Sequence, residues 1–283
     1  ETRRALAAEL AQTLRSMLPP DMKTALVVGL GNRSVTPDSL GPRTAERVLV
    51  TRHMGDCLPR DVPMSSVCAA APGVLGVTGM ETAEILRGMV AHVKPDAVIA
   101  VDALAARSSK RIASTIQITD TGITPGSGVG NHRKALDRRT LGVPVIAVGV
   151  PLVVYASTIA SDALCALGEG EVEEERIAAC VERVVSEKLG EMIVTPRDVD
   201  ALVERMAGVL ADGINQALVL NNRALLSGKL DELLAFLKHS SMTPFAFRLI
   251  YNDVIHTLLR EHAANVADSS DMKDMYDIFS LSG

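Results

Sequence analysis

The chain has 283 residues, a formal net charge of -5 and a pI of about 5.7. This length allows one large α/β domain, or a domain of about 200 residues with an appendage. The 29 Lys and Arg residues are scattered rather than clustered, which argues against a nucleic-acid-binding protein. No stretch approaches 18 uninterrupted apolar residues and no secretory signal is present, so we expect a cytoplasmic protein without a membrane span.

Cysteine and aromatic residues are distributed unevenly. The four cysteines lack CxxC spacing, which predicts reduced structural thiols; they are Cys57, Cys68, Cys165 and Cys180. Tyr155 is the one aromatic residue before position 219, and the other six follow it. Two segments of such different composition predict different packing, so we place a domain boundary near 218. Because the chain opens on Glu1 rather than Met, we also expect a preceding segment to be absent.

Helical repeats alternate with buried apolar runs in the first half of the chain. The predicted elements are a helix over 2–18, a strand over 24–30, a polar loop over 31–38, a helix over 40–54, an apolar strand over 66–71, a Gly-rich turn over 76–79, a helix over 81–93 and a strand over 97–101. Unbroken apolar runs are typical of parallel strands covered on both faces. The order predicts a doubly wound, mostly parallel sheet in a three-layer α/β/α domain.

The second half continues this pattern and then becomes more helical. Its predicted elements are an edge or antiparallel strand over 114–119, a Gly-rich loop over 120–130, a strand over 143–150 ending at Pro151, and helices over 157–167, 171–189, 199–218, 224–238 and 245–264. The acidic stretch 268–283 is expected to be flexible. We therefore predict a catalytic-type domain over 1–218 and a helical extension over 219–283.

Two aspartates follow buried strands. Asp38 comes after the strand over 24–30, and Asp102 directly follows the strand over 97–101. Ligands of such sheets bind beyond the carboxyl ends of the strands. Two carboxylates held together cannot both ionise cheaply, so one would retain a proton while the other acts as a base on water. Helix capping, or ion pairs with Arg43 or Arg107, would use the same aspartates equally well.

Other site chemistries are less well supported by the residues. Gly29-Leu30-Gly31 resembles the start of a dinucleotide fingerprint, but Ser34 replaces the third glycine and the helix begins too late. A metal site would use Asp38, Asp102 and His132, without the paired histidine spacing of the common zinc motifs. We predict no metal and no cofactor.

Several longer strings resemble one family. They are VVGLGNRSVTPDSLGPRTAERVLVTRHM (27–54), APGVLGVTGMET (71–82), VDALAARS (101–108), ITDTGITPGSGVGNHRK (118–134), GVPVIAVGVPLVV (142–154) and MIVTPRDVD (192–200). Together they resemble the germination proteases of spore-forming Firmicutes, over about residues 2–218. The resemblance implies the α/β fold of hydrogenase-maturation endopeptidases. It also implies a homotetramer, made as a zymogen, that degrades small acid-soluble spore proteins in the spore core by cutting after Glu.

The same resemblance implies an atypical aspartic peptidase whose two catalytic aspartates are here Asp38 and Asp102. Weaker candidates for substrate binding are Asn32, Arg107, Gly126, Gly128 and Arg133, since backbone N–H groups and a guanidinium can hold a carbonyl or a Glu carboxylate. Neither nucleic acid nor a membrane is expected as a partner. Two other functions stay open: a metal-dependent maturation-type peptidase, and an inactive scaffold that recruits a partner through 219–283.

Overall fold

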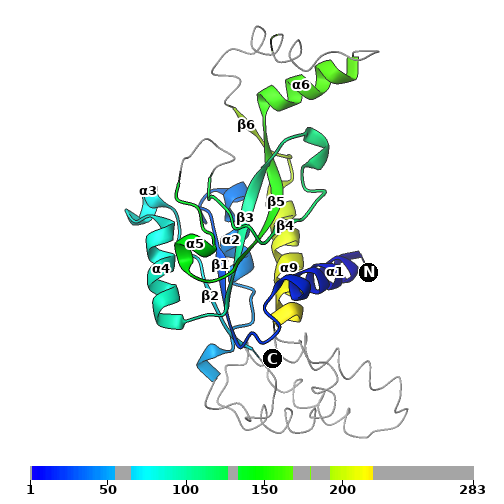
Figure 1. Ribbon diagram of the computed structural model, residues 1–283. Helices are drawn as coiled ribbons and strands as arrows, with labels where there is room; N and C mark the ends of the chain where they lie inside the picture. The colour runs from blue at the N-terminus through cyan, green and yellow to red at the C-terminus, as the bar shows by residue number, and fades with distance from the viewer. Residues whose placement is uncertain (1, 55–64, 127–132, 168–178, 180–191, 219–283) are drawn as a thin grey trace, which may run out of the picture. The chain divides into compact units, whose positions relative to one another are not determined.

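The computed structural model describes residues 2–54, 65–126, 133–167, 179 and 192–218, all within one compact unit (Figure 1). The predicted helices over 224–238 and 245–264, the tail over 268–283 and all but one residue of the predicted helix over 171–189 lie outside these ranges. Cys68 and Cys165, the two cysteines within them, are free thiols.

The described elements alternate between strands and helices. The strands are β1 (Thr24–Gly29), β2 (Ser66–Ala70), β3 (Ala97–Ala106), β4 (Gln117–Thr119), β5 (Val145–Tyr155) and β6 (Ile193–Val194). The α-helices are α1 (Thr2–Met17), α2 (Leu40–Ala45), α3 (Leu75–Thr78), α4 (Thr82–Val93), α5 (Arg138–Leu141), α6 (Ala156–Leu167) and α9 (Val199–Leu218), and the short 3-10 helices are η1 (Thr36–Ser39), η2 (Arg52–Met54) and η3 (Ser109–Arg111).

The sheet has the order β2-β1-β3-β5-β4, with β6 paired to β5. Strands β2, β1, β3 and β5 are parallel, whereas β4 and β6 pair with β5 in the antiparallel direction. The prediction of a mostly parallel sheet with an antiparallel edge strand is thus confirmed. The strand order reverses between β1 and β3, and such a switch point is where doubly wound sheets bind their ligands.

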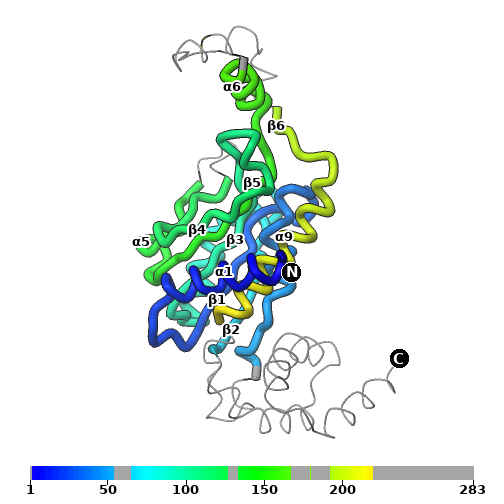
Figure 2. The backbone as a smooth tube through the Cα atoms, turned by 90° about the vertical axis from the view of Figure 1, so that its right-hand side faces the viewer, coloured from blue at the N-terminus to red at the C-terminus, as the bar shows by residue number. Residues whose placement is uncertain are grey.

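Helices cover both faces of the sheet, as Figures 1 and 2 show. On one face, Leu26 and Val28 of β1 and Val98 of β3 join a core that includes Leu86 of α4 and Leu141 of α5. On the other face, α2 contacts β1 and β3, and α9 contacts β5. Side chains of successive strand residues alternate between these faces, so the unbroken apolar runs serve both layers. The three-layer prediction is confirmed.

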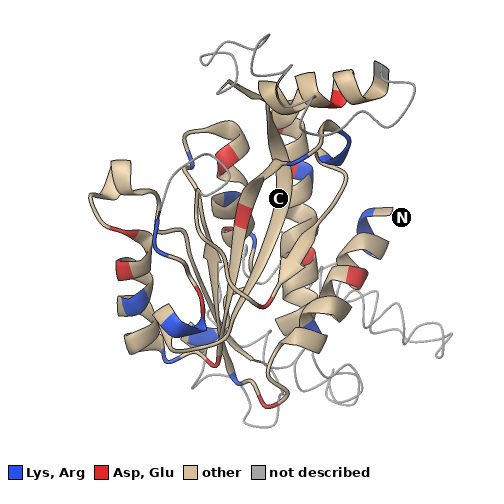
Figure 3. Cartoon of the chain, turned by 45° about the horizontal axis from the view of Figure 1, so that its top comes forward, with Lys and Arg blue, Asp and Glu red and all other residues tan. Residues whose placement is uncertain are grey.

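Helix α1 lies across α9 as an outer element (Figure 2). Its residues Leu10 and Leu14 are buried, and a Cβ at Gly213 of α9 would lie only 2.6 Å from the Leu10 side chain. The small residue therefore permits close helix packing. Charged residues of both signs are interspersed on the helices, with few on the strands (Figure 3).

Helix α2 is shorter than predicted. It ends at Ala45 rather than near 54. Beyond it, the Leu49 N–H donates to Oδ1 of Asn215 over 2.7 Å, and the Thr51 N–H donates to the Val67 carbonyl over 2.9 Å. These partners replace the bonds that would continue the helix, and Val48 and Leu49 are buried in an irregular conformation.

Strands β3 and β5 are longer than predicted, which corrects two expected strand ends. Instead of stopping at 101 and 150, they run together to Ala106 and Tyr155. Pro151 lies inside β5, where its carbonyl accepts from the Ala113 N–H over 2.7 Å, on the side away from β3. The N–H that proline lacks would point to that same side, so the β3–β5 ladder loses nothing.

Candidate active site

Asp102 lies within β3, not at its end, and beside the point where β1 stops. It pairs with Gly149 of β5, whereas β1 pairs with β3 only as far as Val101. Its side chain is buried, at 6% exposure, and Oδ1 accepts the N–H of Ala103 over 2.9 Å. Burial, and then the charge of Asp38, raise the pKa of Asp102 to about 7. This carboxyl group is therefore mostly protonated below neutral pH.

Asp38 is supplied by η1, at the end of the loop that leaves β1. The chain turns at Gly31, which has φ +111, and a Cβ there would overlap the backbone oxygen of Asp38. The Asn32 N–H donates to Oδ2 of Asp38 over 2.6 Å. Burial raises the pKa of Asp38, while the Asn32 N–H and the positive charge of Arg133 act in the opposite direction.

The loop that carries Asp38 is closed at its base by glycines. A Cβ at Gly29 would overlap the backbone oxygen of Gly41, and one at Gly41 would overlap the backbone of Leu30. The strand β1 and the first turn of α2 therefore touch backbone to backbone. This contact requires glycine on both sides and returns the chain to the sheet immediately after Asp38.

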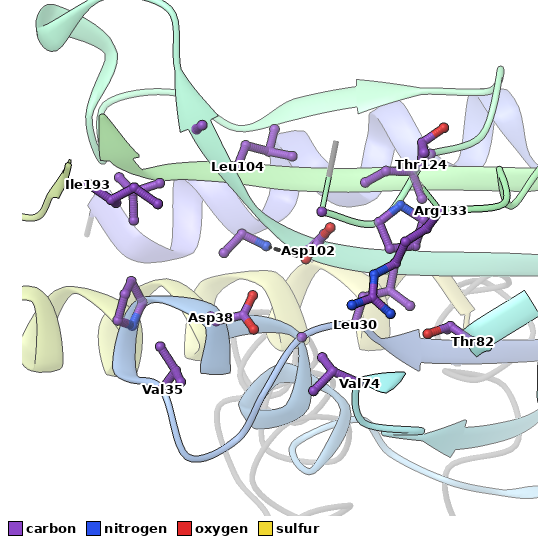
Figure 4. Close-up of a pocket in the computed structure, with 18 of the residues that line it drawn as sticks. Leu30, Val35, Asp38, Val74, Thr82, Asp102, Leu104, Thr124, Arg133 and Ile193 are labelled. Carbon is purple, nitrogen blue, oxygen red and sulfur yellow. Dashed lines mark hydrogen bonds between the residues drawn. The ribbon is translucent and has the colours of Figure 1, made fainter. Parts of the chain in front are cut away.

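Both carboxylates line one cavity of about 670 Å³, shown in Figure 4. This volume is in the range of small-molecule and peptide pockets. The described residues of its wall come from four places: the loop after β1 (Leu30, Gly31, Val35, Pro37), the segment after β2 (Gly73, Val74, Thr82), the sheet from β3 to β6 (Ala103, Leu104, Ala105, Arg107, Gln117, Val153, Ile193, Thr195), and the loop after β4 (Ile123, Thr124, Pro125, Gly126, Arg133).

Arg133 crosses this cavity. In Figure 4 its guanidinium extends from the side of Thr124 toward Leu30. The Nη1 atom is buried and has no hydrogen-bond partner among the described residues. A buried guanidinium nitrogen without a partner is costly, and a carboxylate is the group that would satisfy it best.

Five of the predicted site residues lie on the cavity wall: Asp38, Asp102, Arg107, Gly126 and Arg133. Asn32 binds Asp38 through its backbone, and its side chain Oδ1 accepts the N–H of Ser34 over 3.0 Å. Gly128 and His132 lie outside the described residues.

Sequence reasoning missed Ile193 and Thr195, which reach the cavity because β6 pairs with the far end of β5. Nothing in their local pattern indicates this long-range pairing. Gly73 could have been found, because it follows β2 at the same edge of the sheet.

Neither a metal cluster nor a membrane helix occurs in the part of the chain that the structure describes. No three His, Cys, Asp or Glu side chains there form a group able to hold a metal ion. Within the same residues, every helix is too short or too polar to cross a bilayer.

The arrangement can act on water. Because its pKa is about 7, Asp102 holds a proton below neutral pH. The pKa of Asp38 is also raised, but a backbone donor and a nearby cation favour the charged form of this carboxyl group. One carboxylate that donates a proton and one that accepts it, on a single cavity, are the parts needed for general acid–base hydrolysis.

Three comparisons place the chain among known proteins. A sequence model of the family described as germination protease, peptidase A25, matches residues 1–169. Similar proteins include the germination proteases of Clostridium acetobutylicum, 46% identical over 77% of this chain and 72% of the relative, and of Halalkalibacterium halodurans, 41% identical over 76% and 71%.

Solved structures give weaker matches. A [NiFe] hydrogenase maturation protease, HycI from Thermococcus kodakarensis KOD1, has a TM-score of 0.32 and 20% identity over 70% of this chain and 98% of that one. The hydrogenase maturating endopeptidase HybD from E. coli has a TM-score of 0.26 and 17% identity over 62% and 98%. The fold assignment therefore rests on the strand order itself. By the family match and the identity to curated relatives, the chain belongs to the germination protease family and is a peptidase.

Proposed function

We propose that this peptidase is an endopeptidase that degrades small acid-soluble spore proteins during germination, cutting after Glu and using Asp38 and Asp102 to activate water. The observation that carries the proposal is the pair itself: two carboxyl groups on one cavity, of which Asp102 is buried and has a pKa near 7. Family membership supports the germination role.

The proposed reaction needs one water molecule and no cofactor. Asp38 accepts a proton from water as the water oxygen attacks the scissile carbonyl carbon, while Asp102 donates its proton to the carbonyl oxygen. The tetrahedral intermediate then collapses: the C–N bond breaks, the amine nitrogen takes the proton from Asp38, and Asp102 recovers its proton from the hydroxyl group. Both aspartates return to their starting states.

Arg133 is the proposed partner of the substrate Glu. Its buried Nη1 atom lacks a partner among the described residues, and its charge already acts on Asp38, so it lies near the reacting groups. Arg107 also lines the cavity but is exposed, which makes its charge weaker in effect. Backbone N–H groups at Gly126 and Gly128 are proposed to hold substrate carbonyls, and Asn32 to position Asp38.

Other properties of the proposal rest on resemblance to the family. They are the zymogen precursor, the homotetramer and the spore-core location. We also propose that neither nucleic acid nor a membrane is a partner, because the Lys and Arg residues are scattered and no long uninterrupted apolar run occurs in the sequence. We assign residues 219–283 to a helical extension without a catalytic role.

The deciding experiment replaces each aspartate by asparagine. We expect Asp38→Asn and Asp102→Asn each to lower kcat/KM on a spore-protein substrate by at least about 100-fold, because general acid or base catalysis contributes about 10²–10⁴. Asp212→Asn is the matched control, since that aspartate pairs with Arg3 at the surface, away from the cavity wall.

Circular dichroism of all three variants should match that of the unaltered chain. Activity within threefold of normal in either Asp38→Asn or Asp102→Asn would disprove the paired mechanism. The same assay after exhaustive chelation should retain full activity, and its loss would favour the metal-dependent alternative.

A further inference from the structure

Strand β3 continues for five residues beyond its neighbour β1. The last pairing between them joins Gly29 to Val101, and the Leu30 N–H then donates to the Val101 carbonyl over 2.8 Å. Gly31 turns the chain away from the sheet at that point. From Asp102 to Ala106, β3 keeps its ladder with β5 on one edge and has no strand beside it on the other, within the part of the chain described.

The backbone groups on this open edge can be identified from the alternation of the strand. The Val101 carbonyl points toward β1, whereas the Val98 N–H donates to Pro144, next to β5. Since successive residues point to opposite sides, Ala103 directs its N–H and C=O groups to the open edge. The β3–β5 register shifts between Leu104 and Ala105, but the residue skipped is Leu152 of β5, so β3 itself keeps its alternation and Ala105 points to the open edge as well. Asp102 already accepts the Ala103 N–H. Among the described residues, the Ala103 carbonyl and both backbone groups of Ala105 have no partner outside the β3–β5 ladder, and that ladder lies on the opposite side of β3, so these groups remain unpaired.

This open edge lies on the wall of the cavity that holds the two aspartates. Ala103, Leu104 and Ala105 are half-buried and line it directly. Val35 and Pro37 of the Asp38 loop form another part of the wall, and Ile193 belongs to it as well. Unpaired backbone groups in a half-buried place are uncommon in folded proteins, because a polar group removed from water without a hydrogen-bond partner is destabilising.

We propose that the substrate binds as an added strand along residues 103–105 of β3. This inference rests on the proposed function and deepens it. Backbone groups of Ala105 would bond to the substrate whether the added strand runs parallel or antiparallel to β3. A parallel substrate strand would bond to the Ala103 carbonyl and the Ala105 N–H, and an antiparallel one would bond to both groups of Ala105. Because Asp102 is the residue next to Ala103, the added strand delivers its scissile carbonyl to the two carboxyl groups.

Such a mode selects a class of substrate. A segment can pair with β3 only if its own backbone groups are free, so the enzyme would cleave chains that are unfolded at the cut site. Folded helices that carry the same residues would resist until they open. Side chains of the cavity wall would then recognise the sequence of the substrate, and the backbone of β3 would recognise its extended conformation.

The first test uses the unaltered protein and a set of peptides that contain one cleavage site. Each peptide carries a single N-methylated amide, which removes one N–H donor. We expect kcat/KM to fall about 5–10-fold or more at a position whose N–H faces β3, since one backbone hydrogen bond contributes about 1–1.5 kcal/mol. The neighbouring positions should tolerate methylation. Tolerance within twofold at every position away from the scissile bond would overturn the inference.

The second test removes the donor from the enzyme. Because the Ala105 N–H points away from β5, Ala105→Pro breaks no bond of the ladder. Asp212→Asn, at the surface ion pair with Arg3 and away from the cavity wall, is the control. We expect about a tenfold loss of kcat/KM in the proline variant alone. A folded proline variant with normal kcat/KM would overturn the inference, and if that variant does not fold, the methylation series decides.

A binding measurement separates this inference from the proposed function. Peptide is added to the Asp102→Asn variant, and the amide signal of Ala105 is followed by NMR. A shifted and exchange-protected Ala105 amide supports strand binding even if the unaltered chain cleaves none of the peptides, in which case the proposed function fails alone. Cleavage with no response at Ala105 would leave the function standing and overturn the added strand.

Discussion

The buried Asp102 should make stability depend on pH in a way that asparagine removes. Its pKa moves from 3.8 to about 7 on folding. Between those values the unfolded chain loses a proton that the folded chain keeps, so folding stability falls as pH rises through this window. Stability is unaffected by this group below pH 3.8, and the loss is complete above about pH 7.

The size of the effect follows from the shift. About three pKa units at 1.36 kcal/mol each give a loss on the order of 4 kcal/mol, which is a large share of the stability of an ordinary domain. Asp102→Asn keeps the shape and the oxygen that accepts the Ala103 N–H, but carries no charge. The variant should therefore match the unaltered chain at pH 4 and exceed it by about 4 kcal/mol at pH 8.

Urea unfolding at half-unit steps from pH 4 to 8 measures this difference, because contributions of carboxylates that do not interact with Asp102 cancel on subtraction. The charge of Asp38 is the second cause of the raised pKa. In an Asp38→Asn background the pKa of Asp102 should be lower, so the pH range over which stability falls should end at a lower pH. A difference between the Asp102 variant and the unaltered chain that stays constant across the range would refute the reasoning, since it would mean that Asp102 titrates normally in the folded state.

Two further predictions concern the groups around the aspartates. Arg133→Gln should lower the ratio of kcat/KM for peptides with Glu to kcat/KM for peptides with Gln at the cleavage position by about tenfold or more. It should also move the acid limb of the pH profile to higher pH, because Arg133 lowers the pKa of Asp38. Arg107→Gln is the control, and a loss of the Glu preference in that variant instead would assign the role to Arg107. Gly31→Ala should destabilise the chain by about 2–3 kcal/mol and reduce kcat, because φ is +111 and the new Cβ would overlap Asp38. Gly142→Ala, with φ +78 and open space, should cost about 1 kcal/mol and leave kcat unchanged; equal urea midpoints for the two variants would contradict this account.

The sheet could be predicted from the sequence because its central strands have no polar interruption. Ala25 to Val28 and Ala97 to Val101 are buried on both faces. The general rule that ligands bind beyond strand ends then placed Asp38 and Asp102 at the same edge, and the structure has both on one cavity wall.

The extensions of β3 and β5 could not be predicted. Ala103 to Ala106 consist of Ala and Leu, which favour a helix over a strand, and Pro151 is normally a sign that a strand ends. Their strand conformation depends on pairing with each other, which is a contact between distant parts of the chain. The cavity wall contributed by Ile193 depends on the same extended pair.

The glycine contact at the base of the Asp38 loop bears on how the enzyme can vary. Asp102 is fixed within β3 by its pairing with Gly149 of β5, so it could shift only if the register of the β3–β5 pair shifted. Asp38 instead belongs to a loop that leaves and rejoins the sheet at the touching backbones of Gly29 and Gly41. Insertions or deletions between those two glycines would change the spacing of the two carboxylates and leave the scaffold intact. The position of Asp102 is thus fixed by the sheet, whereas the position of Asp38 can change with the length of its loop.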